Sequence, residues 1–212
     1  TDNPVIIDEE LTISGGNFHG QPLAMALDYA CLAASELGNI SDRRIYLALV
    51  GNSPGVPKLL MKDTGINSGY MILQYTTAAL ASENKGLCFP SSADSIPTSL
   101  GHEDHVSMGS IGGRKALQVI GNVEKILAIE LLTAAQAFEF RKPLKSGVFL
   151  DEVHNAVREQ VAFAVKDRIF ADDIEKGIEM IQHKTIIKVV DRVQKELNIS
   201  LKTKFSTEFE VY

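Results

Sequence analysis

One stretch of the sequence limits the possible folds more than any other, a proline-free run from Glu103 to about Arg141. Its apolar side chains recur at steps of three and four, the spacing of one face of an α-helix. A helix over about residues 103–142 would be roughly 60 Å long, about twice the diameter of a small domain. We expect this chain to be too short to enclose it. The stripe comprises Leu117, Ile120, Val123, Leu127, Leu131, Ala134 and Phe138.

Shorter segments with helical spacing surround this run, whereas extended character is confined to residues 4–14. A helix over 21–37 is predicted to stop at Gly38, and Ser41-Asp42 is a plausible cap for a second short helix through Leu49. Further helices are expected over about 69–84, 151–165, 172–182 and 185–198.

The predicted fold is therefore all-α: an elongated helical bundle with one long central helix (about 103–142) and a short extended N-terminal segment. Residues 1–198 form the helical part, and residues 199–212 are expected to be a polar, loosely ordered tail.

Composition excludes several classes of partner. The net charge is −6 with no basic block, which argues against nucleic acid. Charged residues interrupt every long apolar run, so no membrane span is expected, and no signal peptide is recognised. Cys31 and Cys88 lie far apart without a CxxC spacing. This pattern favours free thiols in a reducing compartment, the cytoplasm.

The segment His102-Glu103-Asp104-His105 resembles a metal site in composition only. Its histidines are three apart, whereas the zinc protease motif needs them four apart on one helical face. We therefore expect no metal. The alternative is a polar first turn of a helix, in which the two acids face the positive end of the helix dipole.

Two glycine-rich segments are further candidates. The segment from Gly15 to Gly20 matches neither phosphate-binding pattern, which favours a flexible turn over a phosphate cradle. Gly109, Gly112 and Gly113 lie inside a helical pattern, where each glycine costs about 1 kcal/mol relative to alanine. They indicate the close approach of another element, either at a crowded active-site face or in tight helix packing.

Five motifs occur in an order that resembles the aromatic amino-acid ammonia-lyases, with the histidine ammonia-lyase branch closest. The resemblance covers about residues 1–182. The motifs are Ser-Gly-Gly-Asn-Phe-His-Gly-Gln-Pro (14–22), Gly-Ile-Asn-Ser-Gly-Tyr-Met (65–71), Ala-Ser-Glu-Asn-Lys (81–85), Asp-Ser-Ile-Pro-Thr-Ser (94–99) and Glu-Asp-His-Val-Ser-Met (103–108).

The resemblance implies elimination of ammonia from L-histidine to give trans-urocanate. It implies a homotetramer whose long helices pack together and whose active sites take residues from three subunits. The family's electrophile, a methylidene-imidazolone, forms from its own Ala-Ser-Gly triplet, and no such triplet occurs here. The chain therefore resembles the C-terminal portion of such an enzyme, inactive alone and dependent on an upstream portion for the electrophile.

The resemblance also assigns site residues. Glu103 corresponds to the acid that faces the substrate side chain, and Phe18 to the aromatic near the electrophile. Asn3 and Met71 correspond to ligand-site and pocket-lining positions. His102 stands where this branch usually has glutamine. It leaves open a tyrosine- or phenylalanine-acting lyase or an aminomutase of the same family. The missing triplet leaves open a non-catalytic helical scaffold.

Overall fold

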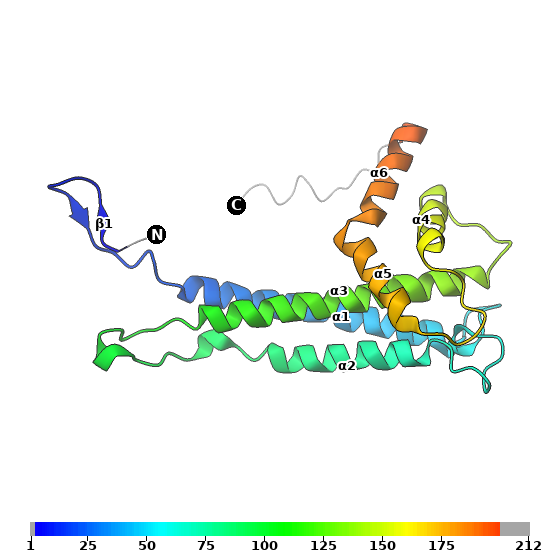
Figure 1. Cartoon of the computed structure of the whole chain (residues 1–212), viewed down its shortest axis with the longest axis horizontal. Coiled ribbons are helices and arrows are strands. Elements are labelled where there is room, and N and C mark those ends of the chain that lie inside the picture. Colours follow the sequence, from blue (N-terminus) through cyan, green and yellow to red (C-terminus); the bar gives the residue numbers. More distant parts are fainter. Residues whose placement is uncertain (1–2, 200–212) are drawn as a thin grey trace. The chain divides into compact units, whose positions relative to one another are not determined.

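The computed structural model describes residues 3–199, and Figure 1 shows that helices dominate them. They divide into two compact units, residues 3–42 with 76–126 and residues 43–75 with 127–199. The long helices α1 (Gln21–Val50), α2 (Met71–Leu87) and α3 (Gly109–Glu139) contribute segments to both units. The second unit also holds α4 (Val148–Gln160), α5 (Phe170–Gln182) and α6 (Thr185–Leu197). The all-α fold class is confirmed.

The extended N-terminal segment is a small antiparallel hairpin of β1 (Val5–Ile6) and β2 (Thr12–Ile13), with Val5 opposite Ile13. The Asp8 carboxylate closes its turn by accepting hydrogen bonds from the backbone N–H groups of Glu10 and Leu11, at 2.9 and 2.8 Å. Such local bonding by aspartate is typical of turns.

Helix α1 is continuous, so the predicted break at Gly38 is wrong. A Cβ at Gly38 would lie 3.2 Å from the Ile126 side chain and 3.3 Å from Val123, so this glycine permits close packing against α3. The predicted cap residue Asp42 is buried inside the helix, where its carboxylate accepts a hydrogen bond from the Thr77 hydroxyl at 2.7 Å. A tertiary contact has replaced the expected cap.

Helix α3 is shorter at both ends than the predicted 103–142. Its start is delayed because the Val106 N–H donates to the Ser95 hydroxyl at 2.8 Å, which holds the preceding residues in a loop. After Glu139 the backbone N–H groups of 140–142 bond to carbonyls three residues earlier, a tightened turn that ends the helix. Helix α1 is almost as long as α3, so the prediction of one dominant helix is wrong.

The buried face of α3 differs from the predicted apolar stripe. In the first unit, Ala116, Val119, Val123 and Ile126 are buried, whereas Leu117 is 74% exposed. Of the seven stripe residues, Val123 alone is buried; the stripe also includes Ile120, 48% exposed, and the exposed Ala134. This chain therefore covers a face adjacent to the stripe and leaves much of the stripe accessible.

The second unit is organised around the amide of Gln136, which is fully buried in α3. Its nitrogen donates to the carbonyls of Leu60 and Ala164 at 3.2 and 2.8 Å, and its oxygen accepts from the Ala164 N–H at 3.1 Å. These bonds hold residues 161–164 outside a helix, which is why α4 ends at Gln160 and not near 165 as predicted.

Within residues 3–199 no helix is long and apolar enough to cross a membrane. Nearly all of the predicted polar tail, residues 199–212, lies outside the described residues.

Candidate functional site

The loop that leads to Glu103 is fixed by a buried carboxylate of α1. Asp28 is 6% exposed and accepts hydrogen bonds from the backbone N–H groups of Ser91 and Ser92, at 3.0 and 2.8 Å. Burial by itself would raise the pKa of Asp28, but these two bonds and the charge of Lys115 lower it below its usual value. Lys115 on α3 also bonds to the Phe89 carbonyl, so two helices hold the start of this loop.

Asp28→Asn is expected to lower the free energy of unfolding by about 1.5–3 kcal/mol at neutral pH, the range for hydrogen bonds to a charged group. Because the folded-state pKa of Asp28 is lowered, this stability is present above the unfolded pKa of about 3.9 and is lost as pH falls further. Urea unfolding from pH 7 to pH 3 should show the gap between wild type and variant closing in acid. Glu36→Gln, at an exposed position of α1, is the control. A pH-independent gap would contradict this prediction.

Glu103 lies on a short loop closed upon itself. The Thr98 N–H donates to the Glu103 carbonyl at 3.0 Å, and these two residues form an isolated antiparallel bridge. Between them Ser99, Leu100 and Gly101 all have positive φ, and the Leu100 side chain is fully exposed. A hydrogen bond from the Ser99 side chain lowers the pKa of the Glu103 carboxyl. The exposed Glu103 side chain is therefore an ionised acceptor at neutral pH.

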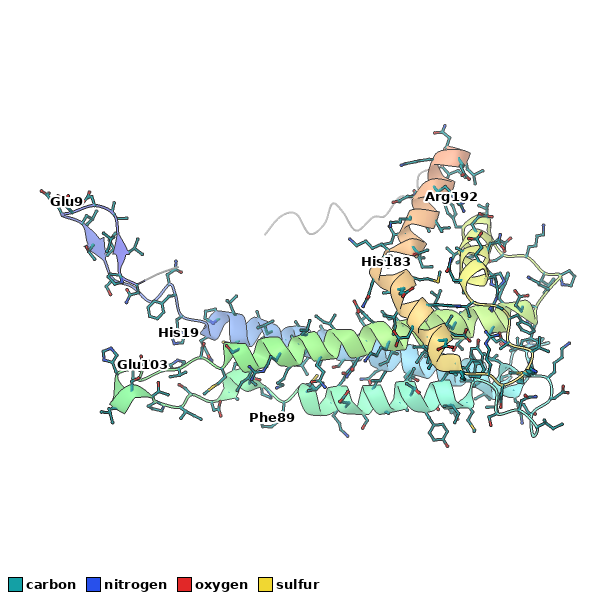
Figure 2. The ribbon with its side chains drawn as sticks, viewed as in Figure 1. Glu9, His19, Phe89, Glu103, His183 and Arg192 are labelled. Atoms are coloured by element: carbon teal, nitrogen blue, oxygen red, sulfur yellow. The ribbon has the colours of Figure 1, made fainter. Side chains whose placement is uncertain are left out.

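Phe18 lies in the glycine-rich turn before α1, with its ring 53% exposed. The next residue, His19, accepts a hydrogen bond from the Gln21 N–H at the start of α1, and its other ring nitrogen lies 2.7 Å from the His105 carbonyl oxygen. Figure 2 shows His19 and Glu103 at the same end of the first unit. The turn that carries Phe18 and the loop that carries Glu103 are thus directly joined.

Asn3 organises the residues just ahead of that turn. Its side-chain oxygen accepts hydrogen bonds from the Ser14 hydroxyl at 3.0 Å and from the Gly15 N–H at 3.1 Å. His102 is exposed beside Glu103. Four of the five predicted site residues therefore belong to the first unit.

The fifth, Met71, opens α2 in the second unit and is half-buried. Asp167 positions the preceding turn, because its carboxylate accepts from the N–H groups of Ser68 and Gly69 at 2.7 and 2.8 Å. Gly69 has φ +57°, and a Cβ there would lie 2.4 Å from the Leu59 carbonyl oxygen. The glycine is therefore required by conformation and by space.

Other features of the described residues do not coincide with these positions. A cavity of about 410 Å³ in the second unit lies among α4, α5 and α6 and is lined by none of the five predicted site residues. Within residues 3–199 no group of three histidine, cysteine, aspartate or glutamate side chains could hold a metal ion.

Comparison with known proteins identifies the family. The model of the family described as "Aromatic amino acid lyase" matches residues 1–159. The chain belongs to the aromatic amino acid lyase family. It is 49% identical over 199 residues to histidine ammonia-lyase of Natranaerobius thermophilus, covering 93% of this chain and 39% of the relative. The chain therefore spans about two fifths of the length of such aromatic amino acid lyases.

Solved structures of the aromatic amino acid lyase family show the same fold. The histidine ammonia-lyase structure from Trypanosoma cruzi superposes with a TM-score of 0.86 at 43% identity, covering 91% of this chain and 38% of that one. Tyrosine aminomutase from Streptomyces globisporus gives 0.83 at 36% identity, covering 90% and 37%.

The residues that hold these candidate positions in place are absent from the sequence prediction. Asp28, Asp167 and His19 all act through contacts with distant segments. A signal for Asp28 does exist in the sequence, because it shares one helical face with Ala24 and Cys31, both buried. A single carboxylate on an apolar face requires buried hydrogen-bond donors.

Proposed function

We propose that this chain is the C-terminal portion of an enzyme that eliminates ammonia from L-histidine to give trans-urocanate. The observation that carries the proposal is the Glu103 carboxylate, exposed and ionised, on a loop joined to the turn of Phe18. An imidazole side chain offers an N–H donor that such a carboxylate binds, whereas phenylalanine offers none. The identity of 49% to a histidine ammonia-lyase supports the same substrate.

Each remaining site residue has a proposed role. Phe18 packs beside the electrophile, and Asn3, Met71 and His102 line the substrate pocket. Asn3 already uses its side-chain oxygen within the chain, so its amide N–H₂ is the part that faces a ligand.

The electrophile must come from outside this chain, because no Ala-Ser-Gly triplet occurs in the sequence. The Phe18 ring is half exposed within its own unit, so it has a free face to offer such a group. The methylidene-imidazolone, once present, supplies an electrophile for the amino group of the substrate. The residues of this chain bind and orient the substrate.

Turnover of tyrosine is the second candidate function. The His102 side chain in place of the usual glutamine and the likeness to a tyrosine aminomutase support it. Comparing kcat/KM for histidine with that for tyrosine separates the two candidates. Turnover of neither by the complete enzyme would favour a non-catalytic scaffold.

The isolated chain is expected to form no urocanate, because the precursor of the electrophile is missing. Purified alone, it should also lack the near-ultraviolet absorbance of the modified group. Adding the upstream portion of the enzyme should produce both. Urocanate formation by the isolated chain would contradict the proposal, and so would a complete enzyme that carries the electrophile but leaves histidine unchanged.

A homotetramer is the proposed assembly, with subunits packed along α3. Leu117 and Ile120 remain exposed, at 74% and 48%, and covering each is worth about 1.5–3 kcal/mol. We expect an interface well over ~1,600 Å². The free thiols Cys31 and Cys88 favour a cytoplasmic location.

Leu117→Glu is expected to dissociate this assembly, because it would bury an unpaired charge in an apolar interface. Light scattering at micromolar concentration should show smaller species for this variant. Lys125→Glu, at an exposed position of the same helix, should keep the assembly. A stable wild-type monomer would remove the proposal.

A further inference from the structure

His19 is held by hydrogen bonds through both of its ring nitrogens. The backbone N–H of Gln21 donates to Nδ1 at 3.1 Å, at the first residue of α1. Nε2 lies 2.7 Å from the carbonyl oxygen of His105 and 3.2 Å from its Nδ1, and the two rings lie 5.0 Å apart between centroids. One side chain thus connects a helix start to a segment 86 residues further along the chain.

These bonds determine the tautomer of His19. Because Nδ1 accepts the Gln21 N–H, it carries a lone pair and no proton. The ring proton is therefore on Nε2, from which it is donated to the His105 carbonyl. The His105 contribution comes mainly from its backbone, which any residue at that position would supply.

The segments on either side of this link are packed closely together. A Cβ on Gly20 would lie 2.6 Å from the Ser107 hydroxyl, and a Cβ on Gly109 would lie 3.5 Å from the Gly20 carbonyl oxygen. The turn of residues 16–20 therefore rests directly against residues 105–109. Phe18 is adjacent to His19, and Glu103 lies two residues before His105.

We propose that His19 is a positioning residue that fixes the Phe18 turn and the Glu103 loop relative to each other through its Nδ1-acceptor, Nε2–H tautomer. This inference rests on the proposed function, since Phe18 and Glu103 are its site residues. His19 itself touches neither the substrate nor the electrophile in this assignment. Its contribution is the geometry in which the substrate side chain is held during the reaction, where small misplacements are costly.

Two substitutions separate the two bonds of His19. His19→Gln keeps an N–H donor at the distance of Nε2, whereas His19→Asn keeps an acceptor near Nδ1 and does not reach His105. In the complete enzyme, His19→Asn is expected to lower kcat/KM for histidine by about tenfold or more, mainly through kcat. His19→Gln should stay within about threefold of wild type. His105→Ala retains the carbonyl and is the matched control, also within about threefold.

Thermal unfolding of the same variants distinguishes positioning from loss of stability. Equal losses of activity in the glutamine and asparagine variants would overturn the proposal, as would wild-type kinetics in His19→Asn. The tautomer is tested independently of activity by ¹⁵N NMR of the wild-type enzyme with labelled histidines. The His19 signal is assigned as the one that is missing from the spectrum of His19→Gln. A protonated Nδ1 on His19 would also overturn the proposal.

The outcomes for this inference are distinct from those for the proposed function. An enzyme that turns over tyrosine but not histidine refutes the proposed substrate. The ranking of the asparagine and glutamine variants on tyrosine, together with the tautomer, would still decide the role of His19.

Discussion

The Glu103→Gln enzyme is expected to lose about tenfold or more in kcat/KM for histidine, because a neutral amide replaces the charged acceptor of the imidazole N–H. Turnover of tyrosine or phenylalanine should fall less, since neither side chain presents an imidazole N–H. The measurement is kcat/KM for each amino acid with the complete enzyme.

The adjacent acid gives a matched control for this substitution. Asp104→Asn removes the same charge from an exposed neighbouring position and is expected to leave the histidine-to-tyrosine preference unchanged. Equal losses of kcat/KM for histidine and tyrosine in Glu103→Gln would contradict a role of Glu103 in recognising the substrate side chain. His102 would then be the first residue to test.

Gly69→Ala is expected to lower the free energy of unfolding by about 2–4 kcal/mol, from a left-handed conformation and from crowding. The new Cβ would lie 2.4 Å from the Leu59 carbonyl oxygen and 2.9 Å from the Met61 Cβ. The segment must shift to relieve these contacts, which would weaken the bonds from Ser68 and Gly69 to Asp167 and move Met71. Denaturant unfolding measures the loss.

Gly86→Ala is the control for this prediction. Gly86 lies inside α2, and a Cβ there would meet nothing within 4 Å. Alanine should stabilise that helix by up to about 1 kcal/mol. If both variants unfold at the wild-type denaturant concentration, the close approach at Gly69 has no energetic consequence and the prediction fails.

The motifs of the sequence point to the family and contain Phe18, Met71 and Glu103, because a short motif keeps residue types and their spacing together. Asn3 and His102 lie outside the motifs and are assigned by the wider resemblance. The folded chain adds the physical state of those residues. Glu103 is ionised and exposed, and Asn3 is already bonded through its oxygen. The assigned roles of these residues remain predictions until the variants are measured.

The contacts that hold the site in place are long-range, and no local pattern contains them. Asp28 bonds to residues 63 and 64 positions away, and Asp167 to residues 98 and 99 positions away. In the sequence, Asp167 has the same appearance as an acid on the surface. The apolar helical face around Asp28 indicates that it is buried but does not identify Ser91 and Ser92 as its partners. Their partners exist only once the chain has folded.

Local sequence patterns establish that the chain is helical and roughly where each helix lies, because the periodic spacing of apolar residues is a local property. Tertiary contacts set the ends of the helices and the faces that they bury. The Thr77 hydroxyl donates a buried hydrogen bond to the expected cap residue Asp42. Because α3 also packs closely against Gly38, α1 continues through both positions. Ser95 holds Val106 out of the helix, so α3 starts late. Local capping preferences are worth about 1 kcal/mol, and a buried hydrogen bond to a carboxylate or close packing in the core outweighs them.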